Sequence, residues 1–212
     1  MEPRVAWDQF LVSLFDPTAF DGMGLLFSKK AQKALNPQIQ VLESRLIVVD
    51  ITVNGVLTTL VNLYAPVGPK ENAAFSRKLT GRHWHRATPH VVAGDFNVTV
   101  NPLLDRPGQR TRINRRIDTT DFEAFVNRLA LEDIWRARNP SSTAITRKGQ
   151  LGASGSRIDR FYVPLALFET VTGPKHKVTP FSDHDAVLLD LYGEFNVTTD
   201  PQRDRPGQAI TP

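Results

Sequence analysis

The stretch His90-Val91-Val92-Ala93-Gly94-Asp95-Phe96-Asn97 decides how the rest of the chain is interpreted. A short apolar run that ends in Gly-Asp predicts a buried strand, and open α/β sheets place the polar groups of their sites at the ends of such strands. Asp95 and Asn97 lie two residues apart, so an extended backbone would aim one carboxylate and one amide at the same spot. The alternative is a plain turn after a core strand. Two further stretches favour a functional site.

The first of these, Ser156-Arg157-Ile158-Asp159-Arg160-Phe161-Tyr162-Val163, predicts a strand with Asp159 on an otherwise apolar face. A carboxylate in that place needs a partner, because an unpaired buried charge is costly. The second, Ser182-Asp183-His184-Asp185, precedes the apolar run 186–191 and offers a carboxylate of the metal-binding type beside a proton-transferring imidazole. Each has an ordinary alternative when taken alone: a structural hydrogen bond for Asp159 and a solvated loop for the Asp-His pair.

Taken together and in this order, Gly-Asp-x-Asn, Arg-x-Asp and Ser-Asp-His resemble the motifs of the endonuclease/exonuclease/phosphatase superfamily. Asn62-Leu63-Tyr64-Ala65-Pro66 looks like the family's Asn-x-Tyr-x-Pro segment. Leu131-Glu132-Asp133-Ile134-Trp135-Arg136, followed by Asn139-Pro140, is similar to the apurinic-type endonuclease domain of LINE-like retrotransposons. The resemblance covers residues 22 to 192. It implies a four-layer α/β sandwich, in which two packed mixed β-sheets are flanked by helices.

The resemblance also implies metal-dependent hydrolysis of DNA phosphodiesters by a nicking endonuclease, with Mg²⁺ or Mn²⁺ as the cofactor. It implies that Asp95 activates or orients the attacking water and that the Asn97 amide holds the phosphate or a metal-bound water. His184, oriented by Asp159, would donate a hydrogen bond to a non-bridging phosphate oxygen. Tyr64 would direct its hydroxyl to the phosphate or leaving group, with a packed ring at a strand end as the alternative. Asp183 and Asp95 are the expected metal ligands.

The family's other principal ligands are a Glu and an Asn on two strands that lie before the region where this sequence begins. Glu2 is the only acidic residue before the first predicted helix, and Met1-Glu2-Pro3 has no strand to hold it. We therefore expect a domain over 1–192 that is incomplete at its N-terminus, lacks the first strands and is impaired by loss of a metal ligand. A catalytically inactive DNA-binding remnant and a phosphatase of the same superfamily are the alternatives.

The composition is that of a single globular domain, with 41% hydrophobic and 23% charged residues in a chain of 212. The absence of cysteine excludes disulfides and thiolate-bound zinc. No apolar run is long enough to span a membrane, and the N-terminus lacks the features of a secretory signal. We expect an intracellular protein, nuclear or cytoplasmic, without a membrane partner.

The distribution of positive charge favours an anionic partner. The formal net charge is +4 and the sequence pI is about 9.6. Five arginines follow the Asp95 strand in a loop that contains Pro and Gly: Arg106, Arg110, Arg112, Arg115 and Arg116. Because this loop leaves from the proposed site, contact with nucleic-acid phosphates is favoured over a plain solvated surface. We expect DNA as the partner, with a downstream reverse transcriptase in the parent element as a further one.

Hydrophobic periodicity predicts the elements around these motifs. Helices are expected over 5–15, 71–84 and 118–129, and the last should turn Phe122, Phe125, Val126 and Leu129 inward. Strands are expected over 22–27, 41–53, 56–64, 90–94, 143–146, 157–163 and 185–192. Asn54-Gly55 should form a tight hairpin turn.

The end of the chain repeats an earlier segment. Residues 94–109 recur at 193–208 with 11 of 16 positions identical. Glu194 replaces the aspartate in this copy, and no second Asp-His pair follows it. We therefore expect 193–212 to be a C-terminal tail, disordered or loosely docked, and not a second site.

Overall fold

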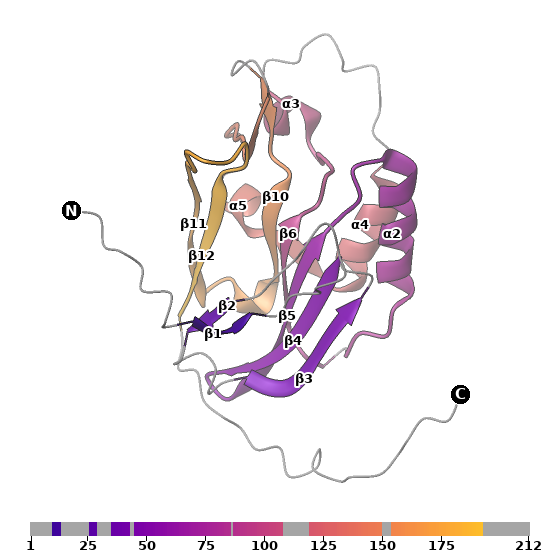
Figure 1. The fold of residues 1–212 in the computed structure, drawn as a ribbon, viewed down its shortest axis with the longest axis vertical. Helices are drawn as coiled ribbons and strands as arrows, with labels where there is room; N and C mark the ends of the chain where they lie inside the picture. Colours follow the sequence, from indigo (N-terminus) through magenta and orange to yellow (C-terminus); the bar gives the residue numbers. More distant parts are fainter. Residues whose placement is uncertain are drawn as a thin grey trace, which may run out of the picture.

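The computed structural model describes residues 10–13, 26–28, 35–42, 45–85, 87–107, 119–149 and 154–192. Its main feature is a six-stranded mixed sheet in the order β3-β4-β5-β6-β10-β7 (Figure 1). The strands are β3 (Leu35–Leu42), β4 (Leu46–Val53), β5 (Val56–Tyr64), β6 (His90–Asp95), β10 (Asp159–Pro164) and β7 (Leu131–Asp133). Strands β5 and β6 are parallel, and helix α2 (Pro69–Gly81) makes the crossover that a parallel pair requires.

Helices α2 and α4 (Thr120–Arg128) cover one face of this sheet (Figure 1). Alternate residues of the central strands point toward them, and Val61, Val92 and Tyr162 belong to the core between the layers. Phe122 and Phe125 of α4 are 6% and 0% exposed, and Val126 and Leu129 pack against the same core. The predicted inward face of α4 is therefore confirmed.

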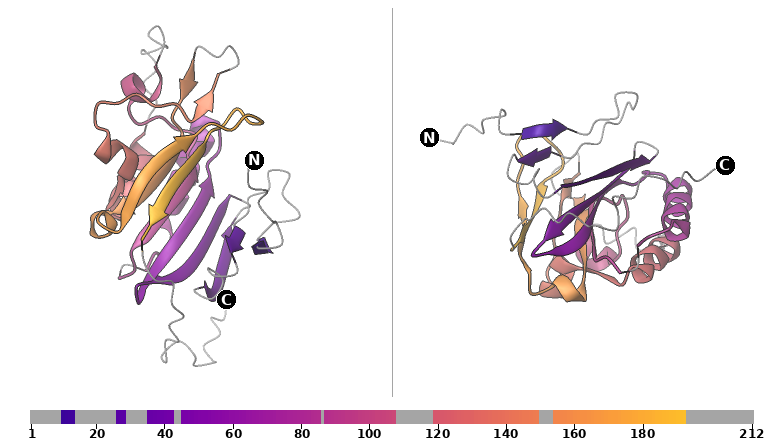
Figure 2. Two further views of the ribbon diagram at one scale, coloured as in Figure 1. Left: turned by 90° about the vertical axis from the view of Figure 1, so that its left-hand side faces the viewer. Right: turned by 90° about the horizontal axis from the view of Figure 1, so that it is seen from below.

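A two-stranded antiparallel sheet lies against the other face of the six-stranded sheet (Figure 2). It consists of β11 (Val171–Lys177) and β12 (Ala186–Leu191). A smaller core, formed by Val91, Ile134, Val163 and Val171, fills the space between the sheets. The predicted class, α/β with two packed sheets and flanking helices, is confirmed. Within the described residues the helical cover lies on the six-stranded sheet, and Leu188 on the outer face of β12 is 44% exposed.

The remaining elements are short. Strands β1 (Phe10–Ser13) and β2 (Leu26–Ser28) pair with each other, as do β8 (Arg147–Lys148) and β9 (Gly155–Ser156). Helices α3 (Pro102–Asp105) and α5 (Ile134–Arg138) and the 3₁₀ helix η3 (Leu165–Leu167) connect longer elements. None of the helices in the described ranges is long and apolar enough to cross a membrane.

Several predicted elements need correction. The helix over 5–15 is wrong in its described part, because 10–13 form a strand whose pairing with β2 outweighs a helical spacing of apolar residues. The strand over 41–53 is two strands, since β3 ends at Leu42 and β4 begins at Leu46. The strand over 143–146 is wrong, because these residues form no ladder and β8 begins only at Arg147.

The Asn54-Gly55 turn is confirmed, with φ values of 51° and 74°. Strands β7 and β11 were not predicted from the sequence. Strand β7 has only three residues, and β11 contains Gly173 and Pro174, which are residue types depleted in strands. The predicted tail, 193–212, lies outside the described residues.

Candidate active site

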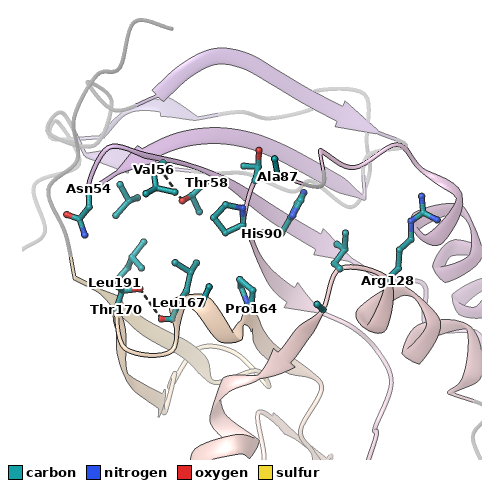
Figure 3. A pocket seen from close by; sticks show the side chains of 16 residues that line it. Asn54, Val56, Thr58, Ala87, His90, Arg128, Pro164, Leu167, Thr170 and Leu191 are labelled. Carbon is teal, nitrogen blue, oxygen red and sulfur yellow. Dashed lines mark hydrogen bonds between the residues drawn. The ribbon is translucent and has the colours of Figure 1, made fainter.

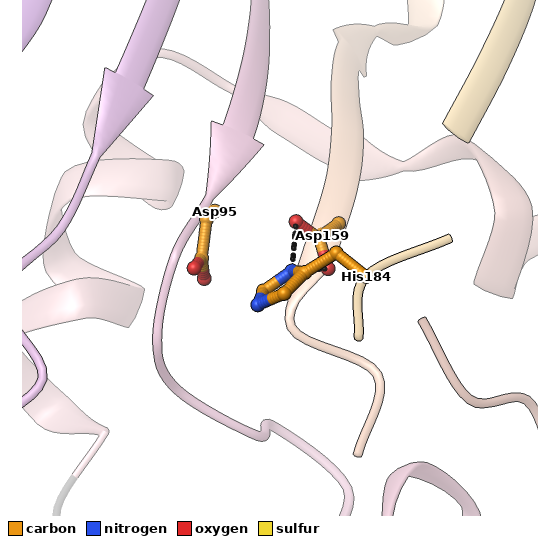
Figure 4. Close-up of side chains that lie close together, drawn as sticks. All are labelled: Asp95, Asp159 and His184. Carbon is orange, nitrogen blue, oxygen red and sulfur yellow. Dashed lines mark hydrogen bonds and ion pairs between the residues drawn. The ribbon is translucent and has the colours of Figure 1, made fainter. Parts of the chain in front are cut away.

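Three side chains from separate parts of the chain meet at one edge of the six-stranded sheet: Asp95, Asp159 and His184 (Figure 4). Asp95 ends β6 and Asp159 begins β10, and the antiparallel register sets the two residues directly opposite each other. His184 comes from the loop before β12. One ligand atom of each residue lies within 4.8 Å of the others. Two carboxylates and an imidazole at this spacing can hold a cation or contact a phosphate.

His184 is held by Asp159. Its Nδ1 lies 3.0 Å from one carboxylate oxygen of Asp159 and 3.2 Å from the other. A carboxylate on Nδ1 fixes the orientation of the imidazole and favours the tautomer with a proton on that nitrogen. The ring lies between the two carboxylates (Figure 4), so Nε2 is the ring nitrogen left for another partner.

Asp95 occupies an unfavourable place for a charged carboxylate. Burial raises the pKa of Asp95 to about 6, and the negative charge of Asp159 acts in the same direction. The backbone N–H of Asn97 and the positive charges of His184 and Arg147 oppose this rise. The surroundings of Asp95 therefore leave its negative charge poorly neutralised, and this charge would stabilise a cation bound at the same edge.

The backbone on both sides of Asp95 adopts positive φ angles, which few residue types tolerate. Gly94 has φ +140°, and a Cβ there would come 1.9 Å from the carbonyl oxygen of Leu63 on β5. The expectation that an extended backbone aims Asp95 and Asn97 at one spot is wrong, because Asn97 lies beyond β6 with φ +47°. Its N–H instead donates to Asp95 Oδ1 at 2.8 Å, a local turn that asparagine tolerates well.

Asn97 is also tied to the neighbouring strand end. Its side-chain amide donates to the carbonyl of Ala65 at 2.8 Å, directly after β5. The amide is therefore fixed in orientation, and Asn97 links Asp95 to the residue that follows β5 by two hydrogen bonds.

Asp183 directly precedes His184 in the chain, and Tyr64 lies on the strand next to that of Asp95. The Asp183 side chain is 61% exposed and forms an ion pair with Arg147, with 3.3 Å between Nε and Oδ2. The hydrogen bond from Arg147 lowers the pKa of Asp183. Tyr64 ends β5 in register with Asp95, and the guanidinium of Arg45 lies 5.1 Å from the centre of its ring. The structure thus brings Asp95, Asp159 and His184 together, whereas the carboxylate of the expected metal ligand Asp183 is not among the ligand atoms that lie within 4.8 Å of one another and is paired with Arg147.

Of the five arginines expected to contact nucleic acid, Arg106 lies in the described part of the chain. It directly follows α3 and is half-buried, and burial lowers its pKa. The other four, Arg110, Arg112, Arg115 and Arg116, lie outside the described residues.

Sequence reasoning missed the buried charges that anchor β10 behind Asp159. Arg157 is 1% exposed and donates to Asp105 at 2.8 Å and to Asp133 at 2.6 Å. Arg136 also donates to Asp105, at 2.7 Å, and Arg160 lies 3.5 Å from the same carboxylate. Burial alone would raise the pKa of Asp105, but hydrogen bonds and charge from Arg157 outweigh it and lower the pKa. Arginines in an otherwise apolar strand were the available signal.

A pocket of about 950 Å³ lies at the opposite end of β6 from the cluster (Figure 3). His90, which begins β6, lines it together with Val56, Leu167 and Leu191. Asp95 ends the same strand, roughly 16 Å away at about 3.3 Å per residue. None of the lining residues in the described part of the chain is acidic, so those residues offer no carboxylate for cation-dependent chemistry.

No family model matches the chain. Over 176 residues it is 29% identical to the transposon TX1 uncharacterized 149 kDa protein of Xenopus laevis, a match that covers 80% of this chain. The chain spans 13% of the length of that protein.

Solved structures show the same fold. An AP endonuclease from Archaeoglobus fulgidus superposes with a TM-score of 0.67 at 18% identity, covering 87% of this chain and 80% of that one. The endonuclease domain of TRAS1, a telomere-specific non-LTR retrotransposon, gives a TM-score of 0.50 at 13% identity, with coverages of 85% and 79%. The chain therefore has the α/β fold of the AP endonucleases, and its resemblance to the endonuclease/exonuclease/phosphatase domain of LINE-like retrotransposons is confirmed.

Proposed function

We propose that the chain is a divalent-metal-dependent endonuclease that nicks DNA. The observation that carries this proposal is the cluster of Asp95, Asp159 and His184 at the sheet edge. Phosphodiester hydrolysis needs a water in line, stabilisation of the charge that grows on the phosphoryl oxygens, and help for the departing oxygen. Two carboxylates and an oriented imidazole supply groups for these tasks.

His184 is the residue proposed to contact the phosphate. Its Nδ1 faces Asp159, so Nε2 is available to donate to a non-bridging oxygen of the scissile phosphate. Asp159 keeps the ring in place through its hydrogen bond to Nδ1. Asp159 is therefore a positioning residue, and His184 acts on the substrate.

Asp95 is proposed to contact the attacking water or a cation, because the Asp159 carboxylate already accepts a hydrogen bond from His184. Mg²⁺ takes one or two protein carboxylates and keeps several waters, and Mn²⁺ accepts the same oxygen donors, so the cluster fits either ion. A bound divalent cation would stabilise negative charge on the phosphoryl group. Asp183 is proposed as a further ligand, which requires that its ion pair with Arg147 opens. Tyr64, in register with Asp95, is proposed to offer its hydroxyl at the border of the site.

DNA is proposed as the substrate because the arginine-rich loop follows β6 and α3 in the sequence. Its five arginines follow β6 within a short stretch of sequence and would neutralise several phosphates of a long polyanion. A phosphatase that acts on a single phosphate has less use for such a loop. The names of the structural neighbours, an AP endonuclease and a retrotransposon endonuclease domain, agree with a DNA substrate. A reverse transcriptase partner and an intracellular location stay predictions.

Nicking of supercoiled plasmid tests the proposal. The purified chain should convert supercoiled DNA to open circles in Mg²⁺ or Mn²⁺ and stop when EDTA is added. A gel shift with the same plasmid in EDTA measures binding alone. A chain that shifts the plasmid but leaves it supercoiled in both metals would be an inactive DNA-binding remnant, and the proposed function would be wrong.

A further inference from the structure

We propose that Thr146 is the positioning residue that holds Asp159 and His184 in the correct position relative to each other. Thr146 lies in the segment just before β8 and is fully buried, with 0% exposure. Thr146 forms hydrogen bonds with the segment that carries Asp159 and with the segment that carries His184. The proposal rests on the nuclease function proposed above and names a residue on which the same site depends.

The hydroxyl of Thr146 fixes the start of β10. Its oxygen accepts the backbone N–H groups of Ile158 and Asp159, each at 3.0 Å. Its own hydrogen can be donated to the carbonyl of Ser156 at 3.5 Å. A hydroxyl has one donor and two acceptor sites, so all of its hydrogen-bonding capacity is directed at 156–159. The side chain therefore sets where the backbone of Asp159 lies.

The backbone of Thr146 fixes the loop that carries His184. Its carbonyl accepts the N–H of Asp185 at 2.6 Å, and the N–H of Lys148 donates to the carbonyl of Asp183 at 2.7 Å. Arg147 and His184 form an antiparallel bridge between these two bonds. The segment 146–148 thus runs alongside 183–185, and one residue links both partners of the Asp159–His184 hydrogen bond.

Loss of this hydroxyl should disturb the site more than the fold. Strand β10 is paired with β6 from Asp159 to Tyr162, and buried ion pairs of Arg157 anchor the residues before it. These contacts do not involve Thr146. The strand stays in the sheet when the hydroxyl is removed, while the two N–H groups at its start lose their acceptor and Asp159 shifts relative to His184.

Two substitutions separate the hydroxyl from the volume of the side chain. Thr146→Val keeps the shape and removes the hydroxyl, whereas Thr146→Ser keeps the hydroxyl. In plasmid nicking, Thr146→Val should lower kcat by roughly 10- to 100-fold, the usual effect of losing a group that orients a site residue. KM should stay unchanged, because no phosphate-contacting side chain is altered, and Thr146→Ser should keep most of the activity. Thr58→Val, the same change at a residue that is 2% exposed on β5, is the matched control and should leave kcat unchanged.

A second readout does not depend on nicking. The hydrogen-bonded Nδ1 proton of His184, assigned by its loss in His184→Gln, should appear in NMR spectra of the metal-free wild type and Thr146→Ser. It should be shifted or lost in Thr146→Val. If the wild type does not nick DNA, the proposed function fails, and this proton still tests Thr146.

An unchanged proton together with an unchanged kcat in Thr146→Val would overturn the proposal, as would equal losses in Thr146→Val and Thr146→Ser. Should Thr146→Val fail to fold, Thr146→Cys replaces it in the comparison, because a thiol sulfur is a weak acceptor. The chain contains no other cysteine, so oxidation to a disulfide within the chain cannot confuse this result.

Discussion

Replacing Asp95 by asparagine should stabilise the protein at neutral pH while it removes nicking. Asp95 has a pKa of about 6 in the folded protein, against an ordinary value of 3.8. The folded state therefore holds this proton more tightly than the unfolded state, and the stability of the wild type falls as pH rises between these two values. Asparagine carries no charge, and its side-chain oxygen can still accept the N–H of Asn97.

The difference between the two pKa values corresponds to about 3 kcal/mol at neutral pH. Asp95 is only half-buried, so solvent screening reduces the expected gain to about 1–2 kcal/mol. For a chain of this size, this gain is a rise in Tm of about 2–8 °C. The gain should be complete above about pH 7 and should disappear near pH 3, where the wild-type carboxyl is protonated in both states.

Thermal melts of both proteins in EDTA, from about pH 3 to about pH 8, measure this difference. Mg²⁺ should then raise the Tm of the wild type more than that of Asp95→Asn, because a ligand stabilises the state that binds it. Asp121→Asn is the control, since that carboxylate lies in an exposed pair with Arg77 and should give no gain. An Asp95→Asn variant that melts at or below the wild type throughout would refute the reasoning from burial.

Two further changes test the anchor of β10 and the arginine-rich loop. Arg157→Met should cost about 3–5 kcal/mol in urea unfolding, because it leaves buried Asp105 and partly buried Asp133 without this partner. A cost near zero would mean that the ion pairs do not anchor the strand. Arg77→Met, in the exposed pair with Asp121, should cost less than about 1 kcal/mol in the same assay. Replacing Arg110, Arg112 and Arg115 by glutamine should flatten the salt dependence of DNA binding by about 0.9 per lost phosphate contact. An unchanged slope in a salt titration would exclude the loop from binding.

The strands that frame the site follow from local patterns in the sequence. The apolar run before Gly94 and the alternation around Asp159 predict β6 and β10, and both strands lie where the patterns indicate. What local patterns cannot give is the register between strands far apart in the chain. Only the folded sheet shows that Asp95 and Asp159 lie directly opposite each other. Burial raises the pKa of Asp95, and the charge of Asp159 adds to this rise.

The failures of sequence reasoning also have physical causes. The left-handed backbone of Asn97 depends on a hydrogen bond to Asp95, so the rule for extended strands did not apply beyond β6. Thr146 carries no motif, and its role arises because a loop between α5 and β8 packs against two other segments. Arg157 was part of a recognised motif, but its burial depends on carboxylates of α3 and β7 that are distant in sequence.

Single-turnover nicking by His184→Gln is the most direct test of the central claim. Glutamine keeps a polar side chain but has no imidazole ring that Asp159 could hold in place. We predict that His184→Gln binds plasmid as tightly as the wild type in a gel shift and nicks it at least about 100-fold more slowly in Mg²⁺, as expected for loss of a group that transfers or donates a proton. Equal nicking rates for the two proteins, purified in parallel, would show that the cluster of Asp95, Asp159 and His184 is not the active site.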